Sequence, residues 1–121
     1  MASGPDVRVR RVYDPPEPSD GCRVLVDRLW PRGVSRERAG VDEWLKDVAP
    51  SSALRAALHG GELDFPDFRR RYRTELAEPG RAAAVDRLRD LARTSAVTLV
   101  TSVRDPDRSH VGVLVAELTG R

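Results

Sequence analysis

The sequence predicts an α/β protein, a single compact domain in which a small, mostly parallel three-stranded sheet is packed by about five helices. Three observations predict this class. The chain has 121 residues, which suits one domain with one core. Two runs rich in β-branched residues, 24–26 and 96–101, have the composition of buried strands. Segments with helical spacing fill the interval between them, as expected where a helical crossover joins parallel strands.

Composition is typical of a protein that folds in water. Apolar residues make up 40% of the chain and charged residues 33%, and no apolar run approaches the roughly 20 residues of a membrane helix. The first six residues lack the basic and apolar regions of a secretory signal. We therefore expect a cytoplasmic protein with no membrane partner.

The amino-terminal part predicts two strands. Residues 1–6 are expected to be a disordered lead, and the domain to span 7–120. Apolar and basic residues alternate from residue 7 to 13, which is typical of a half-exposed first strand. The proline-rich loop 14–21 excludes a helix. It is short for a crossover, so the first two strands either pair antiparallel or the loop crosses to a non-adjacent position.

Helical spacing dominates the middle of the chain. A turn of helix is expected at 35–38, and helices at 41–48, 51–59, 65–77 and 81–93. Ser51 or Ser52 can cap the second of these helices, and Asp64 the third.

The carboxyl-terminal part predicts a third strand, 96–101, parallel to the second. A last helix should begin near Asp107, capped by that residue or by Asp105, and end before Gly120. Its buried stripe is expected to contain Val111, Leu114, Val115 and Leu118.

Polar residues follow both central strands at the points where these strands end. After the second strand they are Asp27, Arg28, Trp30 and Arg32, and after the third they are Thr101, Ser102, Arg104, Ser109 and His110. Neighbouring parallel strands end at the same edge of a sheet, which is where α/β proteins bind ligands. The two groups should therefore line one pocket.

This set predicts the binding of an anionic small molecule, such as a nucleotide or a phosphorylated metabolite. Arg28, Arg32 and Arg104 would hold the anion, since guanidinium groups bind phosphate and carboxylate bidentately. Trp30 could stack on a ring, with Thr101, Ser102 and Ser109 beside the helix start. If a reaction occurs, Asp27 and His110 form the proton-handling pair.

Two alternatives remain open. The protein could be a non-enzymatic module that binds nucleic acid or a protein through the arginines at 69, 70, 71 and 73 in helix 65–77. The nearly balanced charge, 21 basic against 19 acidic residues, makes nucleic acid the weaker hypothesis. Alternatively, the polar strand ends only tie helices to the sheet.

Cysteine and histidine are too sparse for a metal site of the usual kind. Cys22 is the only cysteine, which excludes an intramolecular disulfide and a cysteine-cluster zinc site. It is interpreted as a small apolar residue at the start of a strand. His59 is interpreted as a helix-end residue. No metal ligand is predicted, and the sequence does not indicate whether a cofactor is bound.

Several motifs resemble the YeaO-like branch of DUF488, a large bacterial family labelled as a domain of unknown function. They are Val-Leu-Val-Asp-Arg-Leu-Trp-Pro-Arg-Gly at 24–33, Trp-Leu-Lys-Asp-Val-Ala-Pro-Ser at 44–51, Phe-Arg-Arg-Arg-Tyr-Arg-Thr-Glu-Leu at 68–76 and Val-Thr-Leu-Val at 97–100. The resemblance spans about residues 7–119. It implies a cytoplasmic α/β domain and no established reaction.

The resemblance also implies what this chain lacks. The wider family that the chain resembles includes members with a cysteine after the last strand and a Cys-His-Arg run at the start of the last helix. The corresponding residues here are Thr101, and then Ser109, His110 and Val111. Thiol chemistry and cysteine-based metal binding are therefore not expected. Asp27 and Arg32 match the strand-end acid and the Pro-Arg turn that the wider family shares.

Overall fold

Four parallel strands form the centre of the fold, in the order β1-β4-β2-β3. The computed structural model describes residues 6–120. Its strands are β1 (Val7–Arg11), β2 (Cys22–Leu25), β3 (Glu43–Trp44) and β4 (Val97–Thr101). The predicted α/β class and the parallel pairing of β2 with β4 are confirmed. The sheet has four strands, however, and not the three that were predicted.

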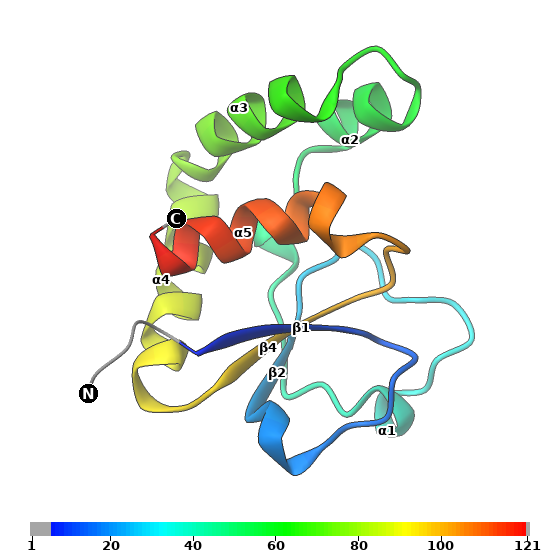
Figure 1. The fold of residues 1–121 in the computed structure, drawn as a ribbon, viewed down its shortest axis with the longest axis vertical. Helices are drawn as coiled ribbons and strands as arrows, with labels where there is room; N and C mark the ends of the chain where they lie inside the picture. Colours follow the sequence, from blue (N-terminus) through cyan, green and yellow to red (C-terminus); the bar gives the residue numbers. More distant parts are fainter. Residues whose placement is uncertain (1–5, 121) are drawn as a thin grey trace.

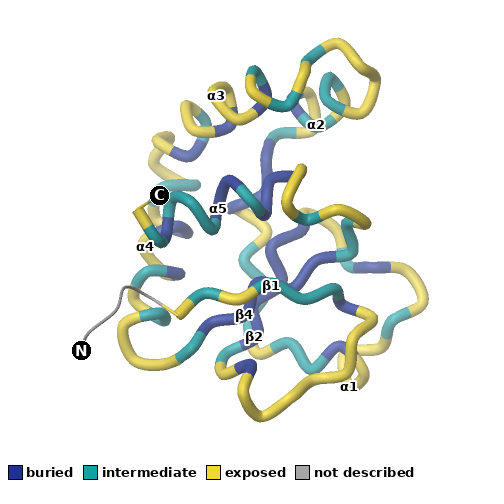
Figure 2. Tube along the Cα trace, viewed as in Figure 1, coloured by how far each residue is buried: buried dark blue, intermediate teal, exposed yellow. Residues whose placement is uncertain are grey.

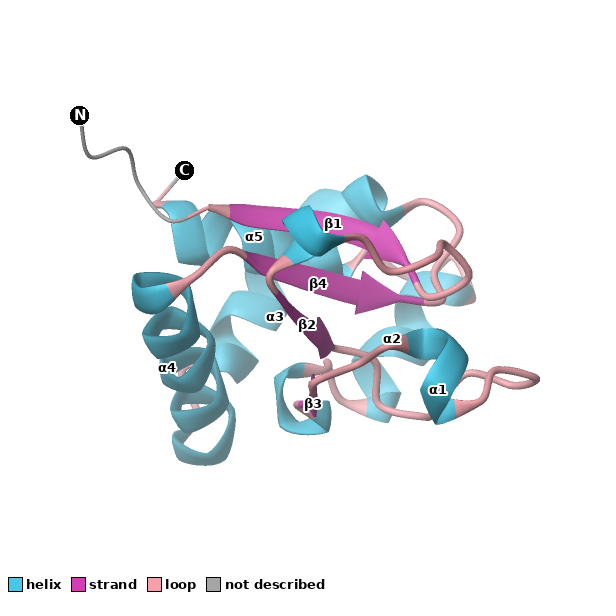
Figure 3. Ribbon diagram, turned by 90° about the horizontal axis from the view of Figure 1, so that it is seen from below, coloured by secondary structure: helices cyan, strands magenta, loops and turns pink. Residues whose placement is uncertain are grey.

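Helices cover both faces of this sheet (Figures 1 and 3). On one side lie α2 (Ser52–His59), α3 (Phe65–Leu76), α4 (Pro79–Thr94) and α5 (His110–Thr119). On the other lie α1 (Arg36–Ala39) and the 3₁₀ turn η1 (Pro18–Asp20). Two further 3₁₀ turns are η2 (Lys46–Val48) and η3 (Pro106–Arg108). None of the helices within 6–120 is long and apolar enough to cross a membrane.

Two apolar cores lie on opposite faces of the sheet, and β2 contributes to both. Val24 and Val26 belong to the larger core under the four longer helices, whereas Leu25 belongs to the smaller core beside α1. All three residues are fully buried, and Figure 2 shows β2 and β4 mostly in dark blue. A strand covered on both faces needs a continuous apolar run, which confirms the interpretation of residues 24–26.

The loop between the first two strands crosses to a non-adjacent position, because β4 lies between β1 and β2. The antiparallel alternative is therefore wrong. Asp20 anchors this loop, accepting hydrogen bonds from Arg23 Nη1 at 2.7 Å and Arg10 Nε at 2.8 Å. The predicted disordered lead, residues 1–6, lies outside the described residues except for Asp6.

The helix predicted at 41–48 is wrong. These residues form β3 and η2 instead, because their apolar side chains are divided between the two cores. Val41 and Trp44 pack in the smaller core, and Leu45 and Val48 in the larger one. A helix would direct all four to one side. The Leu45 amide donates to the carbonyl of Leu25 at 2.9 Å, which pairs the outer edge of β2.

The other helices begin and end close to the predicted residues. Ser51 and Asp64 cap α2 and α3 through their side-chain oxygens. The last helix differs, since it begins at His110 and is capped by Ser109, whose Oγ accepts from the Val111 amide at 3.1 Å. The predicted start near Asp107 is wrong, because that residue belongs to the η3 turn.

Gly21, which precedes β2, is a position where a larger residue would not fit. Its φ of 64° is one that side chains rarely adopt, and an added Cβ would lie 2.2 Å from the Ala96 carbonyl oxygen. That oxygen accepts the Cys22 amide at the start of β2, so it is not free to move. We expect Gly21→Ala to lower the free energy of unfolding by more than about 2 kcal/mol in urea denaturation.

Gly61→Ala is the matched control for this prediction. Gly61 has a similar φ of 78°, but no atom lies within 4 Å of an added Cβ. Only the backbone conformation is then unfavourable, at about 1 kcal/mol. Equal losses in the two variants would contradict the close approach between Gly21 and Ala96.

Candidate functional site

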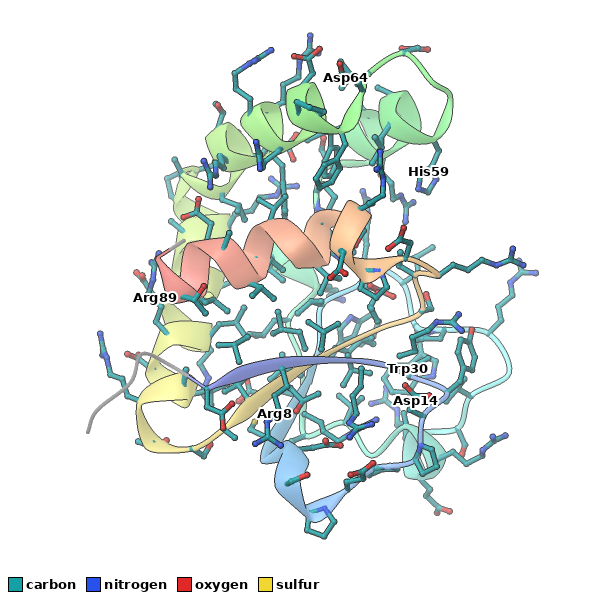
Figure 4. All side chains as sticks on the ribbon, in the orientation of Figure 1. Arg8, Asp14, Trp30, His59, Asp64 and Arg89 are labelled. Atoms are coloured by element: carbon teal, nitrogen blue, oxygen red, sulfur yellow. The ribbon has the colours of Figure 1, made fainter. Side chains whose placement is uncertain are left out.

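A cavity of about 650 Å³ lies at the carboxyl ends of β2 and β4. This volume is within the range of small-molecule sites in proteins. Its wall is formed by the loop after β2, by parts of α2 and α3, and by the segment from the end of β4 to the start of α5. Figure 4 shows two of its lining residues, Trp30 and His59, on the side of the molecule to which the strands point.

Eight of the nine predicted site residues line this cavity. They are Asp27, Arg28, Trp30, Arg32, Ser102, Arg104, Ser109 and His110. Thr101 does not line it, but its hydroxyl donates to Asp27 Oδ1 at 2.7 Å. These residues lie together because the parallel pairing of β2 with β4 brings two segments, more than 70 residues apart in the chain, to one edge of the sheet.

Asp27 joins the ends of the two central strands. Besides the bond from Thr101, its Oδ2 accepts from both the amide and the hydroxyl of Ser102, each at 2.8 Å. Only 8% of the residue is exposed. Both carboxylate oxygens are therefore engaged with β4 and the residue that follows it.

His110 lies against the same carboxylate. Its Nε2 is 3.1 Å from the carbonyl oxygen of Val26 and 3.4 Å from Asp27 Oδ1. Because a carbonyl only accepts, Nε2 must carry a proton. No hydrogen bond to Nδ1 is found within 6–120, and no fully buried side-chain nitrogen or oxygen in this part of the chain lacks a partner. Nδ1 is therefore accessible to solvent.

The surroundings of Asp27 favour its ionised form. Burial alone would raise the pKa of this carboxyl. The hydrogen bonds from His110, from the Ser102 amide and from Thr101 outweigh burial and hold the pKa of Asp27 below its ordinary value. At neutral pH Asp27 is thus a carboxylate and a weak base.

Five arginines line the cavity and give it its charge. They are Arg28, Arg32, Arg55, Arg104 and Arg108. Nine other arginines form ion pairs with carboxylates, whereas for these five no acidic side chain within 6–120 lies closer than 4.0 Å. Arg28 instead donates to the hydroxyl of Ser52. The cavity therefore contains several guanidinium groups that are not neutralised.

Sequence reasoning missed two of these arginines. Arg108 follows β4 in the same segment as Arg104 and could have been found by position alone. Arg55 carries no such signal, because it lies on α2 and reaches the cavity only through the packing of that helix. His59, interpreted as a helix-end residue, also lines the cavity.

Trp30 is only partly available to a ligand. Its Nε1 donates to the carbonyl oxygen of Val34 at 2.7 Å, and its ring meets that of Trp44 edge-on at 5.6 Å. The guanidinium of Arg36 lies 5.0 Å from the ring centre. One ring face is thus covered, and stacking of a ligand on Trp30 stays a prediction.

The single cysteine of the chain lies away from the cavity. Cys22 begins β2, at the end of the strand opposite the cavity. Burial raises the pKa of its thiol, and the nearby carboxylates Asp42 and Glu43 raise it further. No group of three or more potential metal-binding side chains occurs in the described part of the chain.

Comparison with known proteins gives the family. A family model described as "Inactive DUF488-N3 subclade" matches residues 6–121. The chain belongs to this family. It is 43% identical over 109 residues to the uncharacterized protein YeaO of Escherichia coli (strain K12), which covers 90% of this chain and 93% of that protein. The resemblance to the YeaO-like DUF488 family is confirmed.

Mycobacterial relatives are equally well covered. The uncharacterized proteins Rv3073c of Mycobacterium tuberculosis (strain ATCC 25618 / H37Rv) and Mb3100c of Mycobacterium bovis (strain ATCC BAA-935 / AF2122/97) are each 47% identical to this chain over 115 residues. The match covers 95% of this chain and 95% of each relative. No solved structure matches the chain.

Asp27→Asn is expected to destabilise the protein in a pH-dependent way. An amide in place of the carboxylate would put a donor opposite either the Ser102 amide or the Thr101 hydroxyl. We expect a loss of about 2–3 kcal/mol in urea unfolding at pH 7. The folded-state pKa of Asp27 is lowered, so its stabilisation is complete above about pH 5 and disappears as pH falls through that pKa.

The difference between wild type and Asp27→Asn should therefore shrink between pH 5 and pH 3. Asp47→Asn is the control, because Asp47 is an exposed aspartate outside the cavity. A difference that stays constant over this pH range would show that the Asp27 charge does not link the strands.

Proposed function

We propose that this protein binds an anionic small molecule, a nucleotide or another phosphorylated metabolite, in the arginine-lined cavity, and that it does so in the cytoplasm. One observation carries the proposal. Five arginines converge on a cavity of ligand size without a carboxylate partner in residues 6–120, although the same part of the chain pairs nine others. Like charges held close together repel one another, and a bound anion would offset this repulsion.

The arginines reach the cavity from three separate segments. Arg28 and Arg32 follow β2, Arg55 lies on α2, and Arg104 and Arg108 lie between β4 and α5. An anion among them could be bound from several directions, which favours the tetrahedral phosphate group with its several acceptor oxygens. Ser102 and Ser109 are less suited to bind it, because their hydroxyls already donate to Asp27 and to the Pro106 carbonyl.

The proposal is binding without a reaction. Asp27 has both oxygens engaged and a lowered pKa, which makes it a poor general base. The name of the matching subclade, which calls it inactive, supports the same view. If a proton is moved at all, His110 is the group with an accessible nitrogen, and Asp27 would orient it.

Replacing cavity arginines should weaken binding. A thermal-shift and calorimetry panel of nucleotides and sugar phosphates is expected to contain a ligand whose affinity falls at least about tenfold in Arg28→Ala and in Arg32→Ala. Both side chains are exposed, so these variants should fold normally.

Arg38→Ala is the matched control, since Arg38 is also exposed, lies outside the cavity, and has no acidic side chain within 4.0 Å among the described residues. It should bind as the wild type does. A folded protein that ignores the whole panel, or an Arg38→Ala variant as weak as the cavity variants, would contradict the proposal.

A second candidate is the interaction surface of α3. Arg69 and Arg71 are exposed and have no carboxylate partner in residues 6–120, which would suit an acidic macromolecule. Arg70 and Arg73 are paired, with Asp67 and Glu117 respectively, and this reduces the positive charge of the surface.

If α3 binds nucleic acid, a gel-shift with mixed DNA and RNA at low salt should show a complex. The double variant Arg69→Ala/Arg71→Ala should weaken it, and added salt should weaken it further. We expect no shift, in keeping with the nearly balanced charge of the chain. A salt-sensitive complex lost in that double variant but retained in Arg28→Ala would favour the second candidate over the cavity.

A further inference from the structure

The charge of the arginine-lined cavity indicates how many phosphate groups its ligand carries. Five arginines face two aspartates, Asp27 and Asp105, so the lining side chains carry three more positive than negative charges when histidine is neutral. A phosphate monoester carries between about −1.5 and −2 at pH 7, and a second phosphate group brings the total to about −3. The surplus therefore corresponds to a diphosphate.

A neighbouring cavity shows that this surplus is particular to the first. It has a volume of about 600 Å³ and shares Arg28, Leu29 and Pro50 with the arginine-lined cavity. Its two other basic residues, Lys46 and Arg81, are matched by Asp47 and Glu78, and Arg81 is bonded to Glu78 at 3.0 Å. The lining side chains of this second cavity therefore carry a surplus of only one positive charge, against three in the first.

Much of the remaining cavity wall is apolar, apart from two serines and two histidines. Leu58 and Phe68 come from α2 and α3, and Ala49 and Pro50 from the segment before α2. The chain contains no asparagine and no glutamine, the side chains that most readily read the hydrogen-bonding edge of a base. The wall thus offers apolar contact to the organic part of a ligand and few groups that could select a particular base.

From these observations we infer that the ligand is a diphosphate monoester whose organic group is apolar or aromatic. The inference rests on the proposed anion-binding function and narrows its ligand class. The diphosphate would lie among the arginines, and the organic group against the apolar wall. A nucleoside diphosphate and an isoprenoid diphosphate share this chemistry.

Isothermal calorimetry at one salt concentration tests the inference with five probes: inorganic pyrophosphate, AMP, ADP, ATP and geranyl diphosphate. We expect ADP or geranyl diphosphate to bind at least about tenfold more tightly than both AMP and pyrophosphate. Whichever of the two binds more tightly identifies the source of the organic group. UDP, added as a sixth probe, should bind as tightly as ADP, because few groups of the cavity wall could select a particular base.

The failures can be told apart. AMP binding as tightly as ADP, or ATP binding more than tenfold more tightly, would overturn the diphosphate assignment and leave anion binding intact. Pyrophosphate binding as tightly as either ester would overturn the role of the apolar wall. Absence of binding by all five probes would count against the proposed function itself.

Variants provide an independent test. Arg104→Ala/Arg108→Ala leaves a surplus of one positive charge, so its affinity for ADP should fall by a larger factor than its affinity for AMP. Both side chains are exposed, and a thermal unfolding curve checks that the variant folds. Arg38→Ala should change neither affinity. Equal losses for ADP and AMP would overturn the charge argument.

Discussion

The carboxylate of Asp27 is the group on which the geometry of the candidate site depends. It lies just after β2, and its oxygens accept three hydrogen bonds from Thr101 and Ser102 at the end of β4. Because β2 and β4 are parallel neighbours, their ends must separate into different loops at this point. Asp27 holds the two loops together where they diverge, and the cavity lies directly beyond it.

This arrangement separates two kinds of charged group that the sequence presents side by side. Asp27 is buried and satisfied by hydrogen bonds, while Arg28 and Arg32 are exposed and border the cavity. The negative charge thus joins the two strand ends, while the arginines around the cavity have no carboxylate partner among residues 6–120. Thr101 takes part in this division, since it occupies a position where the resemblance to the wider family implies a cysteine. Its hydroxyl donates to the carboxylate of Asp27.

The hypothesis of anion binding and the hypothesis of a structural role apply to different residues of the cavity. Asp27 serves the structural role, in the sense that its removal should cost stability. The arginines have no comparable role, because none of the five pairs with a carboxylate in residues 6–120.

Local sequence determined the helices and strands whose apolar residues follow a single helical or strand pattern. The run Val24 to Val26 predicted a strand covered on both faces, and the caps Ser51 and Asp64 predicted where α2 and α3 begin. The location of the cavity-lining polar residues at the ends of two parallel strands also followed from the sequence, because polar residues come directly after both apolar runs.

Tertiary structure decided the features that depend on contacts between distant parts of the chain. Residues 41–48 have helical spacing, yet their apolar side chains serve two cores on opposite faces of the sheet, so they form β3 and η2. Arg55 lines the cavity only because α2 forms part of the cavity wall. No sequence pattern around Arg55 could indicate this. Which arginines are paired depended on distances across the fold. The residues around the site could thus be predicted from the sequence, but its unneutralised charge could not.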